Sequence, residues 1–279
     1  MVGDHGSDNA LSFAVIRSIF GYDRSMQNPF PARPLVIIPT YNERDNVFLL
    51  IPEILKRDDR LHVLVVDDGS RDNTAGQVLK LAERDWPRRL HLKLRPKKLG
   101  LGSAYVEGFE WGLRRNYDFM IQMDGDWSHH PKYLGGMLRC AGEADFIIGS
   151  RYVPEGGTLN WGTGRRILSK FGSFYSRLVL GVPLADFTGG FNGWSSAVLR
   201  AIGLDALRSN GYSFQIELKY RAHRLGFKHI EYPIIFEERS KGQSKMSAAI
   251  ALEAFWRVWQ FRFFKDVVSR NTQCRPFRR

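Results

Sequence analysis

The fold is decided by residues 34–70, which read PLVIIPTYNERDNVFLLIPEILKRDDRLHVLVVDDGS. Two short β-branched runs, residues 35–38 and 62–66, each stop at turn-forming residues, as buried strands do. Between them, residues 43–56 space their apolar side chains as a helix does. A strand, a helix and a second strand in this order predict a βαβ unit with parallel strands.

The same alternation continues toward the C-terminus. We expect further helices at residues 73–84 and 102–115, and further strands at residues 90–94, 118–123 and 146–149. Strands that alternate with helices predict an α/β fold with a mostly parallel central sheet.

The length of 279 residues suits one large domain with short appendages. Residues 1–33 are expected to be a flexible extension, residues 34–250 the folded domain, and residues 251–279 an aromatic helix with a basic tail. The extension lacks the basic start of a secretory signal. The sequence also holds no run of about 18 apolar residues, so we expect no membrane-spanning helix.

The net charge of +12 favours an anionic partner, which is a nucleic acid, a membrane surface or a phosphorylated substrate. Composition alone does not choose among them. The two cysteines, Cys140 and Cys274, predict neither a disulfide framework nor a metal cluster, and they fit a reducing cytosol.

Polar clusters follow three of the expected strands, at residues 40–43, 67–70 and 124–126. Ligands of open α/β sheets bind outside the carboxyl ends of the strands, so the clusters should meet at one rim. Asp124 and Asp126 can hold Mg²⁺ or Mn²⁺, which prefer oxygen ligands and neutralise a diphosphate leaving group. A solvated acidic turn is the alternative, and we disfavour it because a strand precedes the pair.

Other candidates are less distinctive alone. Asp67 and Asp68 suit either hydrogen bonds to a base or ribose, or a simple strand-ending turn. His129 and His130 are disfavoured as zinc ligands because neighbouring histidines on a loop rarely bind one ion. Five basic residues in segments expected to be loops could line a path for phosphates, with arginine suited to bidentate contacts; they are Arg151, Arg165, Arg166, Arg239 and Lys245.

Five motifs together resemble a known family. In chain order they read PTYNE (39–43), VVDDGS (65–70), DGD (124–126), GSRY (149–152) and FEERSKGQSKM (236–246). The chain resembles the dolichol-phosphate mannose synthase, or polyprenol monophosphomannose synthase, branch of the family 2 GT-A glycosyltransferases. The resemblance covers about residues 34–250 and implies a single Rossmann-like GT-A domain with C-terminal helices.

The resemblance implies a role for each matching position. The nucleotide-sugar donor, GDP-mannose by preference, would be bound by Pro39, Tyr41, Glu43, Asp67, Asp68, Asp124, Asp126 and Arg151. The metal, Mg²⁺ or Mn²⁺, would be held by Asp124 and Asp126. The phosphate of a polyprenyl acceptor would be handled by Arg151, Arg166, Arg239, Ser244 and Lys245. The catalytic set would be Asp124, Asp126, Arg239 and Lys245. One departure is Asn192, where the family often has arginine, and this departure bears on recognition of the sugar.

The expected reaction is inverting transfer of a hexose to a polyprenyl phosphate. The acceptor phosphate ionises with a second pKa of about 6, so it can attack without a dedicated base. The same fold with UDP-glucose as donor is the nearest alternative, and a sugar nucleotidyltransferase is a more distant one. A nucleic-acid partner is disfavoured because carboxylates at the rim would repel phosphates.

The acceptor's lipid tail implies that the protein works on a membrane, at its cytoplasmic face. Phe255, Trp256, Trp259 and Phe263 recur at helical spacing near basic residues, as in a peripheral membrane helix. The alternatives are an aromatic helix packed on the core and a separate membrane-anchoring subunit.

Overall fold

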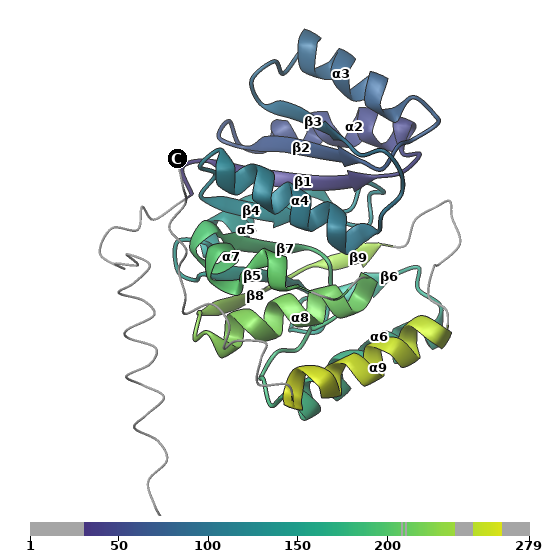
Figure 1. The fold of residues 1–279 in the computed structure, drawn as a ribbon, viewed down its shortest axis with the longest axis vertical. Helices are drawn as coiled ribbons and strands as arrows, with labels where there is room; N and C mark the ends of the chain where they lie inside the picture. Colours follow the sequence, from purple (N-terminus) through teal and green to yellow (C-terminus); the bar gives the residue numbers. More distant parts are fainter. Residues whose placement is uncertain (1–30, 208, 210, 238–247, 264–279) are drawn as a thin grey trace, which may run out of the picture.

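The computed structural model describes residues 31–207, 209, 211–237 and 248–263, and its centre is a seven-stranded sheet (Figure 1). The strand order is β3-β2-β1-β4-β7-β5-β8. The strands are β1 (Pro34–Thr40), β2 (His62–Asp67), β3 (Leu90–Leu94), β4 (Phe119–Gln122), β5 (Phe146–Ser150), β7 (Asn192–Ser195) and β8 (His229–Pro233). β7 pairs antiparallel with both its neighbours, and the other pairs of this sheet are parallel. The predicted mostly parallel α/β sheet is therefore confirmed.

Helices cover both faces of the sheet. They are α2 (Arg44–Leu55), α3 (Thr74–Arg84), α4 (Leu101–Arg114), α5 (Leu134–Cys140), α6 (Thr163–Leu180), α7 (Ser196–Ile202), α8 (Gly211–Arg224) and α9 (Ala248–Phe263). Two short 3-10 turns, η2 (Pro131–Tyr133) and η3 (Leu204–Ala206), and a two-stranded parallel ribbon of β6 (Gly157–Leu159) and β9 (Ile235–Glu237) complete the described elements.

The core consists of two apolar layers, one on each side of the sheet. Side chains alternate between the layers along β1, with Leu35 and Ile37 on the side of α4 and α8, and Val36 and Ile38 on the side of α2, α3 and α5. All four are fully buried. A strand buried on both faces reads as a continuous apolar run, which is why this segment was recognisable from the sequence.

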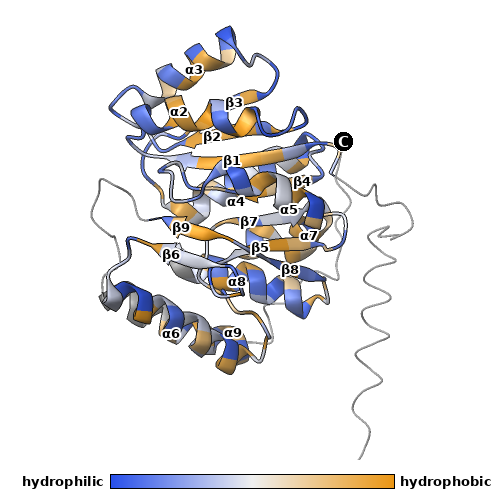
Figure 2. Cartoon of the chain, turned by 180° about the vertical axis from the view of Figure 1, so that it is seen from behind, coloured by the Kyte–Doolittle hydropathy of each residue, from blue (hydrophilic) through white to orange (hydrophobic). Residues whose placement is uncertain are grey.

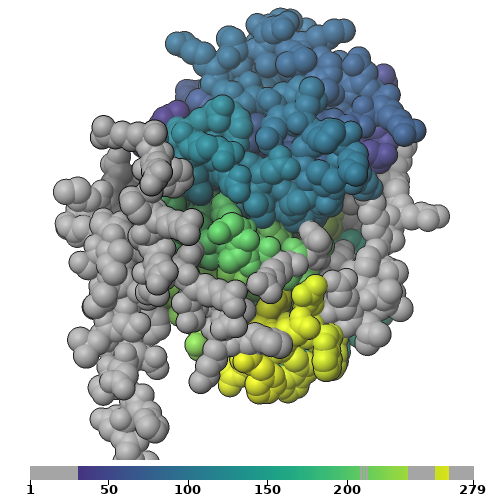
Figure 3. Space-filling model, in the orientation of Figure 1, coloured from purple at the N-terminus to yellow at the C-terminus, as the bar shows by residue number. Residues whose placement is uncertain are grey.

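The helices α6 and α9 pack against each other at one end of the molecule, far from α3 at the other end (Figures 1 and 3). Tyr175 of α6 stacks on Phe255 of α9 with ring centroids 4.3 Å apart. Among the described residues, no helix is long and apolar enough to cross a membrane. The predicted extension at 1–33 and the basic tail after α9 lie almost wholly outside the described residues.

Candidate active site

The first two polar clusters form one hydrogen-bonded rim, because β1 and β2 are adjacent and parallel. Thr40 Oγ1 donates to Asp67 Oδ2 over 2.8 Å, and Ser70 Oγ donates to the same oxygen over 2.6 Å. Asn42 links the two loops again, since its N–H donates to Ser70 Oγ over 2.8 Å. The buried Asp67 therefore joins the two loops by hydrogen bonds and holds residues 40–43 in place beside it.

Asp68 pairs instead with Arg95, whose guanidinium donates to it. The Arg95 side chain is 1% exposed and also donates to Glu107 over 2.9 Å and to Ser103 over 2.6 Å. Arg95 is not among the candidate residues of the sequence analysis. The structure makes it the residue that fixes Asp68 against the start of α4.

The remaining predicted donor residues lie along the same rim. Pro39 and Glu43 are partly buried, and Tyr41 is 37% exposed. Lys98 Nζ lies 4.4 Å from the centre of the Tyr41 ring, within range of a cation–π contact. An exposed ring beside a cation offers a planar group and a charge to a nucleotide.

The third cluster follows β4, which is the other neighbour of β1. The Asp124 side chain is 30% exposed, and Asp126 is mostly buried with its Oδ1 accepting from Ser128 Oγ over 2.6 Å. Tyr105 donates its hydroxyl to Asp124 Oδ1 over 3.3 Å. Burial and the Asp124 charge raise the pKa of Tyr105, so it stays a neutral donor. The three predicted clusters therefore do meet at adjacent strand ends.

His129 fixes the backbone of this loop. The N–H of Asp124 donates to His129 Nδ1 over 3.0 Å, and the ring stacks on Phe191 with centroids 4.9 Å apart. Burial lowers the pKa of His129. His130 Nδ1 instead accepts from the backbone of Lys132 over 3.1 Å. The two rings thus make different loop contacts.

Two carboxylates fit a hard divalent cation, since Mg²⁺ and Mn²⁺ take oxygen ligands. No group of three or more His, Cys, Asp or Glu side chains gathers as a metal site anywhere in the described ranges. A cation on Asp124 and Asp126 would therefore need further oxygens from the donor diphosphate and water, as is usual for Mg²⁺ at phosphate sites.

Arg151 lies at the end of β5 and forms a buried ion pair with Asp186. Its Nε and one terminal nitrogen donate to the two carboxylate oxygens, each over 2.7 Å, and the carboxylate is fully buried. The terminal nitrogen also donates to Thr188 Oγ1 over 2.8 Å. Burial opposes ionisation of Asp186, but the charge and hydrogen bonds of Arg151 outweigh it and hold the pKa of the carboxyl well below its usual range.

Lys219 of α8 holds the loop that contains Asp186 through hydrogen bonds to the backbone of that loop. Its Nζ donates to the carbonyls of Asp186, Phe187 and Gly189 over 2.8–3.1 Å. Burial lowers the pKa of Lys219 to about 8, although the Asp186 charge favours its protonated form. The sequence analysis missed the Arg151–Asp186 pair and Lys219. Asp186 lies 35 residues after Arg151 and 33 residues before Lys219, and no local sequence pattern links residues so far apart.

The remaining predicted phosphate-binding residues fall into two groups. Arg165 and Arg166 were expected in a loop but lie in the first turn of α6; Arg165 packs 4.3 Å from the ring of Trp161, and Arg166 is exposed. The expectation of a loop was wrong because the chain is already helical from Thr163 onward. Arg239, Ser244 and Lys245 lie outside the described residues.

Comparisons with known proteins agree with this geometry. The model of the family "Glycosyl transferase family 2" matches residues 35–203. A polyprenol monophosphomannose synthase of Mycolicibacterium smegmatis is 46% identical over 237 residues, which is 83% of this chain and 89% of the relative. An undecaprenyl-phosphate mannosyltransferase of Micrococcus luteus is 45% identical over 226 residues, which is 81% of this chain and 92% of the relative. These relatives confirm the resemblance stated from the motifs.

Solved structures share the fold. Glucosyl-3-phosphoglycerate synthase of Mycobacterium tuberculosis, in complex with Mn²⁺, uridine diphosphate and glucosyl-3-phosphoglycerate, superimposes with a TM-score of 0.61 over 94% of this chain and 86% of its own, at 14% identity. The predicted GT-A architecture is thus confirmed. With a family model that covers more than half of its length, the chain belongs to glycosyl transferase family 2 and is a glycosyltransferase.

Proposed function

We propose that this glycosyltransferase moves mannose from GDP-mannose to a polyprenyl phosphate, with inversion at the anomeric carbon. The observation that carries the proposal is that both relatives, aligned over more than four-fifths of the chain, are named for mannose and a polyprenyl acceptor. The rim of carboxylates, exposed tyrosine and nearby cations supports it, because a charged nucleotide sugar needs these groups.

On the donor side, the nucleotide lies over the loops after β1 and β2, with Tyr41 and Glu43 beside the base and Asp68 beside the ribose. Asp124 and Asp126 hold Mg²⁺ or Mn²⁺, which when bound neutralises charge on the leaving diphosphate. His129 and Tyr105 hold Asp124 in position, through its backbone N–H and its carboxylate respectively.

On the acceptor side, a phosphate oxygen forms the new bond to the anomeric carbon while the bond from that carbon to the diphosphate breaks and GDP leaves. The phosphate is already ionised near neutral pH, so no side chain needs to remove a proton. We assign Arg166, Arg239, Ser244 and Lys245 to neutralising the acceptor's charge and aligning it, and the last three lie outside the described residues. Positioning and charge neutralisation are then the enzyme's contribution.

A transfer assay with purified protein tests the proposal. The protein is incubated with polyprenyl phosphate and radiolabelled GDP-mannose or UDP-glucose, with Mg²⁺, Mn²⁺ or EDTA. We expect label in the lipid phase from GDP-mannose, GDP as co-product, and loss of transfer in EDTA or in Asp126→Asn. Asp205→Asn, an exposed carboxylate in η3, is the matched control. Equal transfer from UDP-glucose would reassign the donor, and conversion of GDP-mannose and added diphosphate to GTP and mannose 1-phosphate would indicate a nucleotidyltransferase.

The acceptor also implies a membrane surface, and α6 supports this part of the proposal. Its buried face is made of Ser169, Ser173, Ser176 and Leu180. Its apolar side chains point outward, with Phe171 56%, Phe174 62% and Leu178 70% exposed. In Figure 2 the ribbon of α6 carries both hydrophobic and hydrophilic segments along its length. A helix that exposes apolar and basic residues together suits the interface of an anionic bilayer.

The helix α9 extends the same surface. Phe255, Trp256, Trp259 and Phe263 are 38–69% exposed, while Val258 and Phe261 face the core. We propose that α6 and α9 together rest on the cytoplasmic face of the membrane, with a separate anchoring subunit as the alternative. Flotation with anionic vesicles, with and without residues 266–279, tests this; we expect salt-sensitive binding that weakens on truncation. No binding at low salt would favour the separate subunit.

A further inference from the structure

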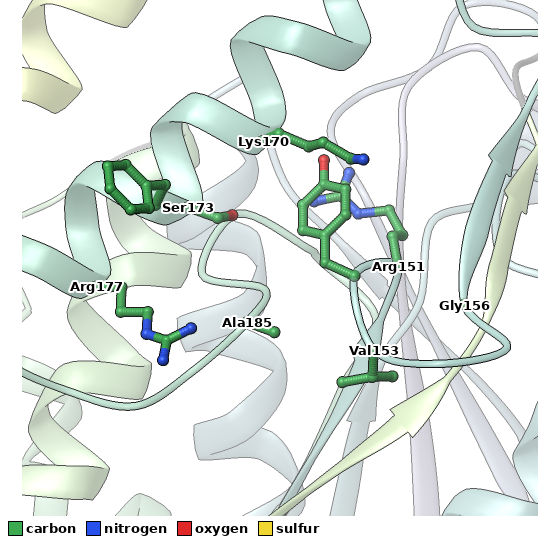
Figure 4. Close-up of a pocket in the computed structure, with 9 residues that line it drawn as sticks. Arg151, Val153, Gly156, Lys170, Ser173, Arg177 and Ala185 are labelled. Atoms are coloured by element: carbon green, nitrogen blue, oxygen red, sulfur yellow. The ribbon is translucent and has the colours of Figure 1, made fainter.

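A cavity of about 350 Å³ opens between α6 and the segments that follow β5 and precede Asp186 (Figure 4). Lys170, Ser173, Phe174 and Arg177 line it from α6, and Ala185 lies on the opposite wall. The guanidinium of Arg151 also borders the cavity, but it is held by Asp186. Besides the paired Arg151, the cavity therefore has basic side chains of its own, Lys170 and Arg177.

The charge of the cavity is positive. Lys170 and Arg177 are exposed and lie seven residues, or about two turns, apart on α6. Within the described part of the chain, neither forms a salt bridge, and none of the nine lining residues is acidic. Lys170 Nζ lies 5.9 Å from the ring of Tyr152, a long contact that leaves it able to reach a ligand. Two cations without a carboxylate suit a phosphate group.

The apolar surroundings narrow the class of ligand. Phe174 lines the cavity itself, and Leu178, one turn further along α6, is 70% exposed. A hydrophilic phosphate compound would leave these side chains in water. A phosphate attached to alkyl chains would bind the cations and cover the apolar residues at once.

We propose that this cavity binds the phosphate of an anionic phospholipid of the bilayer, with the acyl chains running beside Phe174 and Leu178. The inference rests on the proposed docking of α6 and α9 to a membrane. A headgroup held here orients α6, and with it Arg166 near the start of the same helix, toward the lipid surface from which the acceptor arrives. The site thus supplies selectivity for lipid charge and a fixed orientation.

Flotation with vesicles of phosphatidylcholine, alone or mixed with phosphatidylglycerol and free of polyprenyl phosphate, tests the proposal. An interfacial Lys or Arg contributes about fivefold in affinity for an anionic surface, so Lys170→Gln/Arg177→Gln should weaken binding to the mixed vesicles by roughly 20-fold or more. Lys80→Gln/Arg88→Gln removes the same two charge types at the opposite end of the molecule and should change binding by less than about twofold. Equal losses in the two double variants would overturn the proposal.

A second variant separates a pocket from general charge attraction. Ala185→Phe fills the cavity and leaves every charge in place, so it should abolish most of the preference for phosphatidylglycerol while the thermal unfolding temperature stays near that of the wild type. An unchanged preference in a folded Ala185→Phe protein would overturn the pocket. Polyprenyl phosphate is also added to phosphatidylcholine vesicles, to see whether it restores binding that Ala185→Phe then abolishes. That result would identify the acceptor as the occupant of the cavity and would also overturn the phospholipid proposal.

The vesicle-binding measurements do not depend on the transfer reaction. Failure of mannosyl transfer with a preserved, cavity-dependent preference for phosphatidylglycerol would overturn the proposed function and support the lipid site. Normal transfer to a detergent-solubilised acceptor by Lys170→Gln/Arg177→Gln, together with weak vesicle binding, is the result we expect from both proposals.

Discussion

Replacing Asp186 by asparagine should strongly destabilise the fold, because it leaves the buried charge of Arg151 without its partner. The carboxylate accepts from two guanidinium nitrogens and from the backbone N–H groups of Arg151, Thr188 and Gly189. Asparagine retains the shape and one acceptor oxygen but has no charge. Lys219 Nζ, which donates to the carbonyl of residue 186, then also loses the favourable charge of Asp186 and keeps that of Glu231.

The size of the effect follows from the burial of the pair. Asp186 is 0% exposed and the Arg151 side chain 6%. Removing one member of a buried pair costs about 3–5 kcal/mol, because the other charge stays desolvated. For a domain of this size, that corresponds to a fall of about 10 °C in the unfolding temperature. If Arg151 mainly served a bound phosphate, the free protein would show a much smaller loss.

Thermal and urea unfolding of the ligand-free protein measure this loss. Asp85→Asn, which removes the carboxylate of the exposed Arg84–Asp85 pair, is the matched control and should not shift the unfolding temperature measurably. The double variant Arg151→Met/Asp186→Asn should recover part of the loss, because the uncompensated guanidinium is gone. A loss below about 1 kcal/mol in Asp186→Asn would refute a stabilising role for the pair.

Three further outcomes are expected. Because the pKa of Asp186 is depressed in the folded state, its contribution is complete above the unfolded carboxyl pKa of about 4 and is lost as the pH falls further; the difference in stability between wild type and Asp186→Asn should therefore shrink in acid unfolding series. Gly149→Ala should destabilise by about 1–3 kcal/mol, since its Cβ would lie 2.7 Å from the carbonyl oxygen of Phe191, whereas Gly164→Ala in α6 meets nothing within 4 Å and should stabilise by about 0.5–1 kcal/mol. Transfer should occur to polyprenyl phosphate and not to the corresponding free alcohol; equal rates on both would point to a hidden base.

The elements that the sequence predicted well are those buried on both faces. The run predicted at residues 35–38 is β1 (Pro34–Thr40), and the run predicted at 62–66 is β2 (His62–Asp67). Both are apolar enough to stand out without any knowledge of their neighbours. The rim could be predicted for a related reason, because adjacent parallel strands bring their carboxyl ends together.

The antiparallel strand β7 could not be predicted from the sequence in this way. Its four residues, NGWS, carry no alternation of apolar side chains. Its place depends on tertiary fit: a Cβ on Gly193 would lie 2.5 Å from the Phe119 ring, and Trp194 stacks on Phe146 with centroids 5.2 Å apart. Such close approaches depend on distant partners that no local pattern reveals.

The helix α6 defeats local reasoning in another way. Its serines face inward and its phenylalanines outward, so a rule that assigns apolar side chains to the core predicts the wrong face. Apolar area left in water forgoes about 25 cal/mol per Å² of stabilisation, and natural surfaces rarely keep large apolar patches without a use. The inverted pattern therefore supports our proposal that the anionic partner, which composition alone could not choose, is a lipid surface. Such a surface would cover the exposed phenylalanines and attract the basic residues together.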